Sequence, residues 1–270
     1  MTIPASESQP QPEATSTPAA ASRDQTFWAA GGSSRLQVTD APKGALNLNV
    51  TGRRLNSPVQ GFGKMWQKTY KAVLPATAAT PTQVIAEWKA HFPSFWPKGN
   101  AFHGPLTGIA PGDVALLNLS MPGKVKMSTG VMVLYADDES FTLMTPQGHM
   151  FAGWITFSAF GQPGSTVIQA QVLMRANDPL YELGLALGGH RKEDKFWQHT
   201  LGAVAAHFGV ADAKVDVQAV VVDKKRQWNK VRNIWHNALI RSALYMFSAP
   251  VRLVAKPFRR RTPKATPSAE

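Results

Sequence analysis

The stretch Met127–Phe160 constrains the fold most, because strand-like segments follow one another with turn residues wherever the chain would reverse. Thr129–Tyr135 is rich in Val, Met and Leu, and it ends at acidic residues that favour a solvated turn. Pro146 and Gly148 supply the next reversal, since proline presets one turn dihedral and glycine permits a positive one. The pattern predicts an antiparallel meander that ends in a long strand.

Other segments are predicted to extend or cover this sheet. Phe62–Leu74 alternates apolar and polar residues as a half-buried strand does, although Lys68 interrupts the pattern. Val167–Arg175 alternates most regularly. Thr80 has the capping sequence of an early helix, and Lys192–Phe208 carries an apolar stripe at helical spacing. These elements together predict an α+β domain.

The charge of the chain lies at one end. Twelve of the 29 Lys and Arg residues lie between Lys224 and Lys264, and no Asp or Glu lies among them. Residues 1–223 hold the other 17 basic residues (29 minus 12) and 16 of the 17 acidic ones. A nearly neutral body with a basic end indicates an appended electrostatic anchor rather than a nucleic-acid-binding fold. The chain has no cysteine, which excludes disulfides and thiolate metal sites.

Composition divides the chain into four parts. Residues 1–44 begin with a Pro-, Ala- and Ser-rich stretch that lacks the apolar run of a secretory signal, and we expect a disordered segment there. Residues 45–210 are predicted to form the folded domain. Residues 211–249 should hold a late strand and a basic amphipathic helix, and residues 250–270 a basic tail.

Three stretches of the domain carry a family resemblance: PVQGFGKMWQKTY, STGVMVLYADDESFTLMTPQGHMFAGWITFSAF and RANDPLYELGLALGGHRKEDKFWQHTL. They resemble a bacterial branch of the START-like, birch-pollen-allergen-like helix-grip superfamily, often labelled SRPBCC. The resemblance covers roughly residues 45–210. It implies a curved antiparallel sheet wrapped around a C-terminal helix, with an apolar cavity for lipids, sterols, polyketides or other hydrophobic molecules. It implies no particular reaction, because this fold hosts carriers and cyclases alike.

Nine side chains on the predicted apolar faces and at the cavity rim are expected to contact such a ligand. They are Leu117, Leu119, His149, Ile155, Phe157, Val172, Met174, Trp197 and Leu201. The same faces would be equally apolar in a filled core, so the sequence leaves open whether a void exists. His149 follows a glycine turn, where it either hydrogen-bonds a ligand headgroup or caps its own turn.

No specific catalytic motif is present, since G-x-S-x-G, H-E-x-x-H, Walker A and G-x-G-x-x-G are all missing. Asp137, Asp138 and Glu139 favour a solvated hairpin tip over a cation site. We therefore expect no catalytic residues, metal or cofactor, and the protein is more typical of a carrier than of an enzyme. An enzyme of the cyclase or hydrolase type on the same scaffold is the alternative.

The segment from about Lys225 to Ser248 is predicted to form a basic amphipathic helix, because apolar residues recur at helical spacing beside basic ones. It is too interrupted to span a bilayer, so it would lie on an anionic membrane surface on the cytoplasmic side. The expected membrane-binding residues are Lys225, Arg226, Trp228, Lys230, Arg232, Trp235, Arg241, Arg259, Arg260 and Arg261. The alternatives are a stripe packed against the domain, a protein-interaction module, or nucleic-acid binding, for which the body adds no positive charge.

Overall fold

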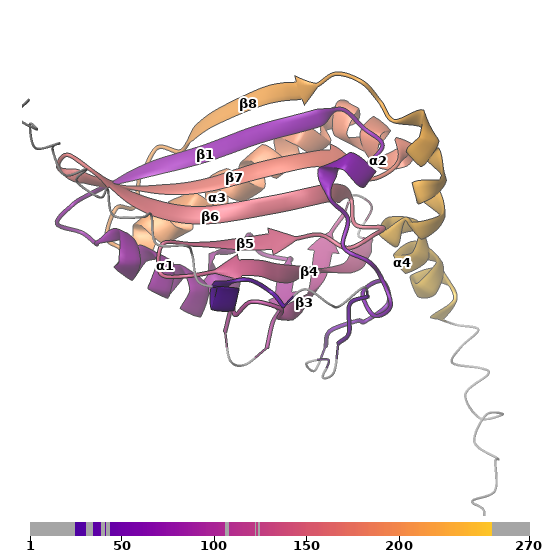
Figure 1. Cartoon of the computed structure of the whole chain (residues 1–270), viewed down its shortest axis with the longest axis horizontal. Coiled ribbons are helices and arrows are strands. Elements are labelled where there is room, and N and C mark those ends of the chain that lie inside the picture. The colour runs from indigo at the N-terminus through magenta and orange to yellow at the C-terminus, as the bar shows by residue number, and fades with distance from the viewer. Residues whose placement is uncertain are drawn as a thin grey trace, which may run out of the picture.

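The computed structural model describes residues 25–249, except residues 31–34, 39–40, 42–43, 106–107, 122 and 124. Its strands are Met65–Pro75 (β1), Ala101–His103 (β2), Val114–Ser120 (β3), Lys126–Ala136 (β4), Ser140–Met144 (β5), Phe151–Gln162 (β6), Ser165–Ala176 (β7) and Asp216–Asp223 (β8). They form one antiparallel sheet in the order β2-β3-β4-β5-β6-β7-β1-β8 (Figure 1). Because β1 lies between β7 and β8, the first strand in the sequence pairs with the last two.

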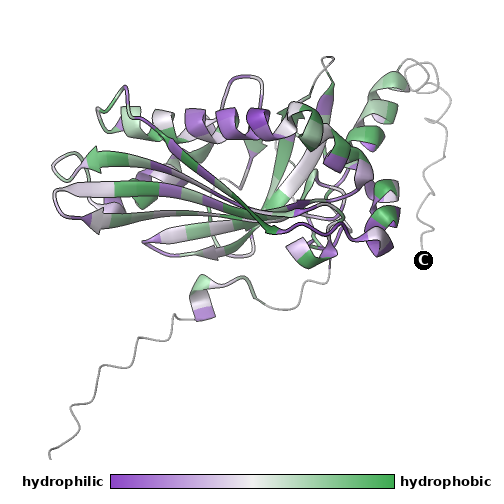
Figure 2. Cartoon of the chain, turned by 90° about the horizontal axis from the view of Figure 1, so that it is seen from above, coloured by the Kyte–Doolittle hydropathy of each residue, from purple (hydrophilic) through white to green (hydrophobic). Residues whose placement is uncertain are grey.

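The helices are Pro81–Ala90 (α1), Pro179–Gly184 (α2), His190–His207 (α3) and Ala238–Phe247 (α4). Shorter 3-10 turns cover Gln25–Phe27 (η1), Pro58–Gln60 (η2), Phe92–Phe95 (η3) and Trp228–His236 (η6), and a π-helical turn, Leu185–Gly189 (η5), joins α2 to α3. The long helix α3 lies along one face of the sheet, which curves around it (Figures 1 and 2). The helix α1 packs against β6 and β7 on the same side.

The strands of the meander and the helix that packs on them agree with the prediction. The predicted strands Phe151–Phe160 and Val167–Arg175 are antiparallel neighbours, with Phe157 opposite Ala170. On α3, Leu201 is fully buried, and the Trp197 ring lies 5.5 Å from the ring of Phe157 on β6. The helix-grip architecture of a curved antiparallel sheet around a C-terminal helix is thereby confirmed.

The core lies between the concave face of the sheet and the helices α1 and α3. Its centre is aromatic, because Phe157 stacks on Phe141 at a ring distance of 4.7 Å and meets Trp88 at 5.0 Å and Phe92 at 5.1 Å. Phe92 belongs to η3, where prolines stop α1 and turn the chain across the open end of the core. Edge-to-face contacts of this kind hold the early helix on the sheet.

The prediction of one helix from Lys225 to Ser248 is wrong. The segment is a 3-10 run, η6, followed by α4, and the two are separated at Asn237, whose backbone is not helical. The reason is capping: the Asn237 side chain accepts a hydrogen bond from the backbone N–H of Ile240 at 3.0 Å, so it begins a new helix rather than continuing the old one.

The predicted boundaries at residues 44, 210 and 249 stay predictions. Residues 1–24 and the basic tail 250–270 lie outside the described residues. Within the segment expected to be disordered, Leu36 is buried in a small cluster with Val50, Leu116 and Met132 on the outer side of the sheet. The described part of residues 25–44 therefore includes contacts with the sheet.

Curvature of the sheet depends on a glycine in β6. Gly153 has a φ of +155°, and a Cβ at this position would lie 2.1 Å from the carbonyl oxygen of Leu173 on β7. A side chain there would separate the two strands or strain the backbone. The close approach lets β6 and β7 bend together around α3.

We expect Gly153→Ala to lower the free energy of unfolding by about 3 kcal/mol or more, because it adds both a steric overlap and an unfavourable φ. Gly161→Ala is the matched control in the same strand, since a Cβ at Gly161 meets no atom within 4 Å. Urea unfolding followed by circular dichroism measures both. Equal stability of the two variants would contradict this account of the curvature.

Candidate functional site

Most of the predicted ligand residues are buried. Five of them belong to the main apolar core, namely Leu117, Phe157, Val172, Met174 and Leu201, and His149 is buried as well. Two hollows on the described residues lie elsewhere, one over β1 and β8 beside Lys71 and the other between α1 and His207. Neither of these two hollows is lined by any of the nine predicted residues.

The remaining apolar ligand residues, Leu119, Ile155 and Trp197, are only partly buried. Three further partly exposed side chains, Trp66, Phe151 and Phe196, pack against the same core and were not predicted as ligand residues. We call these six side chains the apolar rim. The Trp197 ring lies 4.8 Å from that of Phe196. All six are partly exposed, so apolar surface that packs against the core reaches solvent at these positions.

A buried polar cluster lies beside the rim. Lys68, which interrupts the alternation of β1, points into the domain with only 1% of its surface exposed. Its Nζ donates hydrogen bonds to Glu193 Oε2 at 2.9 Å and to Asp194 Oδ1 at 2.8 Å, at the start of α3. The hydroxyl of Tyr70 donates to the same oxygen of Asp194 at 2.8 Å. These contacts join the first strand to the gripped helix.

The electrostatics of this cluster follow from its burial. Burial, and then the nearby carboxylate of Glu193, raises the pKa of Tyr70 well above its usual range, so the phenol keeps its proton and donates a hydrogen bond to Asp194. The ring of His190 lies 4.6 Å from that of Trp66, and its Nδ1 is 3.7 Å from Glu193 Oε2. Sequence reasoning did not identify this cluster. The signal it missed is a lysine on an apolar strand face, which requires acidic partners elsewhere in the chain.

His149 takes up the turn-capping role. It is buried, and its Nδ1 accepts a hydrogen bond from the backbone N–H of Phe151 at 3.0 Å. Burial lowers the pKa of His149 to about 4, so the imidazole is neutral at physiological pH. The turn it caps sets the start of β6. We therefore leave His149 out of the ligand site that we propose below.

The C-terminal segment Trp228–Phe247 packs on the domain largely through polar side chains, together with Ala238 and Leu239. The Asn237 side chain is fully buried, and its Nδ2 donates to Asp178 Oδ2 at 2.9 Å. On α4, the hydroxyl of Ser242 accepts a hydrogen bond from the backbone N–H of Ser128 at 3.0 Å, which joins the helix to β4. Arg241 donates from Nε to Asn49 Oδ1 at 2.9 Å. The polar residues of this segment are thus used in attaching it to the domain.

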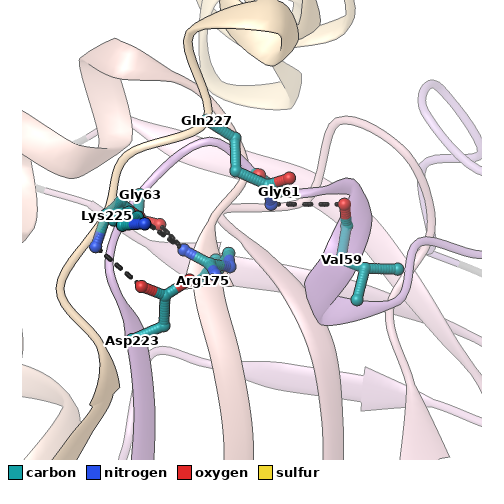
Figure 3. Close-up of polar contacts among 7 residues, drawn as sticks. All are labelled: Val59, Gly61, Gly63, Arg175, Asp223, Lys225 and Gln227. Atoms are coloured by element: carbon teal, nitrogen blue, oxygen red, sulfur yellow. Dashed lines mark hydrogen bonds and ion pairs between the residues drawn. The ribbon is translucent and has the colours of Figure 1, made fainter.

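A second network holds the start of this segment (Figure 3). Arg175 on β7 donates from Nη1 to the carbonyl oxygens of Gly63 at 2.6 Å and Lys225 at 2.8 Å, and it pairs with Asp223 through Nη2. The side chain of Gln227 donates to the carbonyl oxygen of Gly61 at 2.8 Å. The chain after β8 is therefore fixed to the loop before β1. These bonds set the position of the following residue, Trp228.

The apolar side of the segment faces outward. Trp228, Trp235 and Phe247 are 70%, 78% and 76% exposed. Sequence reasoning missed further exposed apolar residues on α2 and η5, which lie at the same end of the domain as α4 (Figure 1). We call the seven most exposed of these apolar residues the C-terminal surface: Leu183, Leu187, Trp228, Val231, Trp235, Leu244 and Phe247. Hydrophobic positions along α4 are visible in Figure 2.

The predicted basic residues surround this surface as far as the structure describes them. Lys225, Arg226, Arg232 and Arg241 are exposed and Lys230 is partly exposed, whereas Arg259, Arg260 and Arg261 lie outside the described residues. Arg226 pairs with Glu182 of α2 at 2.9 Å. Among the described helices, none combines the length and the hydropathy that a membrane span requires. The described His, Asp and Glu residues form no group of three that would suit a metal ion.

The topology decides the fold: eight antiparallel strands curve around one long helix near the end of the domain. The chain has the START-like helix-grip fold. No protein-family model matches the sequence, and no curated protein matches it either.

Solved structures resemble the chain at low sequence identity. A START superfamily protein from Mycobacterium smegmatis is 21% identical, with a TM-score of 0.37 over 54% of this chain and 98% of that one. Ara h 8.0201 is 12% identical, with a TM-score of 0.38 over 53% and 97%. The di-domain ARO/CYC StfQ of the steffimycin biosynthetic pathway is 10% identical, with a TM-score of 0.39 over 52% and 50%. At these scores the likeness assigns no ligand or activity.

We predict that His149 makes the folded helix-grip domain less stable in acid. Its folded-state pKa of about 4 lies below the usual value of 6.5, so below pH 6.5 the unfolded chain takes up a proton that the native chain refuses. Stability should fall between pH 6.5 and 4 by at most about 1.4 kcal/mol per pH unit from this residue. His149→Gln keeps a hydrogen-bond acceptor and removes this slope.

The measurement is urea unfolding of both proteins at pH 7.5, 6.0 and 5.0. His199→Gln, on an exposed position of α3, is the matched control and should retain the slope of the parent chain. An unchanged pH dependence in His149→Gln would refute the assignment.

Proposed function

We propose that this protein binds a hydrophobic small molecule at its helix-grip domain and works on an anionic membrane surface, to which its C-terminal surface attaches it. The observation that carries the proposal is the orientation of the segment Trp228–Phe247, which buries polar side chains and exposes large apolar ones. Polar residues that would suit solvent are buried against the domain, whereas two tryptophans and a phenylalanine are left in water. An exposed apolar surface of this kind is typical of an interaction site.

Charge favours a membrane as the occupant of this surface. Six basic residues lie between Lys224 and Arg241, and no acidic residue lies between residues 224 and 249. Each basic residue near an anionic lipid surface contributes roughly 1 kcal/mol, and Arg226 contributes less because Glu182 already pairs with it. Tryptophan is suited to the headgroup boundary, where its apolar ring is buried and its N–H stays hydrated. Charge and aromatic insertion therefore act on the same side of the domain.

The ligand part of the proposal rests on the apolar rim. Six large apolar side chains that pack against the core remain partly exposed, from β1, β3, β6 and α3. The centre of the domain is filled by its own aromatic rings, so a ligand of substantial size enters by displacing side chains at the rim. Leu119 and Phe151 also contact a second cluster beneath α2 and α4. The rim is thus adjacent to the elements that would face the membrane.

We expect the double variant Trp228→Ala/Trp235→Ala to bind vesicles at least about 10-fold more weakly than the parent chain, because each large side chain contributes on the order of 1 kcal/mol when partly inserted. The measurement is co-sedimentation with vesicles of phosphatidylcholine alone or with 30% phosphatidylserine as a chosen composition. Trp28→Ala is the matched control, since Trp28 is also exposed and packs on one aromatic ring, Tyr135 of β4, as Trp228 packs on Phe62, but it lies outside the C-terminal surface.

High salt should reduce binding to the acidic vesicles without abolishing it, because screening weakens the charge contribution and leaves the aromatic one. Equal sedimentation of the double variant and the control would overturn the membrane proposal. Preferred binding to single-stranded nucleic acid, with a steep logarithmic dependence on salt, would replace it with the nucleic-acid alternative.

The ligand proposal predicts that protein purified from its source carries a co-purifying lipid-like molecule. Native mass spectrometry should record an added mass that disappears after denaturation. Substituting Trp197→Ala at the rim should reduce this bound fraction, whereas Trp28→Ala should not. If the source protein shows no added mass and the protein also takes up no hydrophobic probe in solution, the ligand proposal is wrong. The domain would then be a protein-interaction module.

A further inference from the structure

The buried polar cluster contains a hydrogen-bond acceptor that the described residues leave without a partner. Glu193 is 8% exposed, and its Oε2 accepts a hydrogen bond from Lys68. Its other oxygen, Oε1, is buried and has no hydrogen-bond partner among the described residues. A carboxylate oxygen in this state costs at least about 1–3 kcal/mol, so an unsatisfied acceptor is typical of a place that receives a partner from outside the chain.

Glu193 lies next to the apolar rim. It precedes Trp197 by one turn of α3, and residues four apart lie on the same side of a helix. His190, whose Nδ1 lies 3.7 Å from Glu193, packs its ring at a tilt against Trp66, another rim residue. Across the sheet, Lys68 pairs in register with Val172, which pairs in turn with Ile155. The carboxylate therefore lies where a molecule held by the rim would place its polar end.

The charge of the cluster selects the kind of polar group. One ammonium, from Lys68, faces two carboxylates, from Glu193 and Asp194, so these three groups carry a formal net charge of −1. A second negative group would be repelled, because like charges interact strongly where water is scarce. A hydroxyl or an ammonium would instead donate a hydrogen bond to the free oxygen.

We infer that the hydrophobic ligand has a polar end that donates hydrogen bonds, a hydroxyl or an amine, and that Glu193 Oε1 accepts from it. This inference rests on the proposed ligand binding at the rim. It excludes fatty acids and other carboxylates as preferred ligands, although the basic C-terminal end would attract them electrostatically.

Three probes with the same apolar chain test the inference on the full protein: 1-decanol, decylamine and decanoate, each titrated at pH 7 by isothermal calorimetry in the absence of lipid. We expect decylamine and decanol to bind at least 10-fold more tightly than decanoate. Tighter or equal binding of decanoate would overturn the donor assignment while leaving the ligand proposal intact. No binding of any probe would overturn both the assignment and the ligand proposal.

The variant Glu193→Gln keeps the shape of the side chain and removes its charge. It should reduce the ratio of decylamine to decanoate affinity by at least 10-fold, while Glu87→Gln, on α1 beside His207, should leave the ratio unchanged. Because Glu193→Gln also loses an ion pair with Lys68, thermal unfolding is measured alongside. The order of the three probe affinities for the parent chain tests the inference whether or not the variant folds.

Discussion

The concave face of the sheet is apolar, so other apolar side chains must shield it from water. The structure depends on how α3 packs against this face. The helix presents Leu201 and Val204 to the sheet, and its first turn is attached to β1 by the buried ammonium of Lys68. Removing the lysine would leave two carboxylates at a buried position, and removing the carboxylates would leave a buried ammonium, so each half of the cluster requires the other. The ion pairs thus fix where the helix begins on the sheet, and apolar packing does the rest.

The packing beside α3 is not uniform. Next to α1, Phe92, Phe141 and Phe157 fill the space between sheet and helices with their own rings, and Phe157 also lies 5.5 Å from Trp197. Trp197 itself stays partly exposed, one helical turn after Glu193 of the polar cluster. The domain therefore has a region packed with its own aromatic rings and an adjoining region in which apolar surface and an unsatisfied carboxylate oxygen of Glu193 occur together. This adjoining region is where we propose that a ligand binds.

Much of the fold could be predicted from local chemistry, because turn residues and strand alternation are properties of neighbouring residues. The meander around Pro146 and Gly148 is of this kind. Lys68 could be recognised only as an interruption, since its partners lie more than a hundred residues away on α3. The break at Asn237 was missed although its cap is local, because apolar spacing does not show that the Asn237 side chain accepts a hydrogen bond from the N–H of Ile240 while its Nδ2 bonds to Asp178. Apolar periodicity alone left open whether the apolar side of this segment meets the domain or a membrane.

The sites were also hard to predict because the sequence does not show which side of the C-terminal segment meets the domain. An amphipathic pattern indicates that one side of a segment is apolar, but it does not tell which side meets the domain. Here Ser242 and Asn237 face inward, and the tryptophans face outward. The exposed Leu183 and Leu187 join them only because α2 and η6 meet in the fold. An exposed apolar surface built from two separate parts of the chain has no signature in either part.

Hydrogen–deuterium exchange of the full chain, with and without vesicles, tests the central claim most directly. The account predicts that backbone amides of residues 228–247 and of α2 exchange more slowly when vesicles containing phosphatidylserine are added, while amides of β8 and α1 are unchanged. Neutral vesicles should give a smaller effect. Unchanged exchange in residues 228–247, or protection confined to another face of the domain, would contradict the claim that this outward-facing surface contacts the membrane.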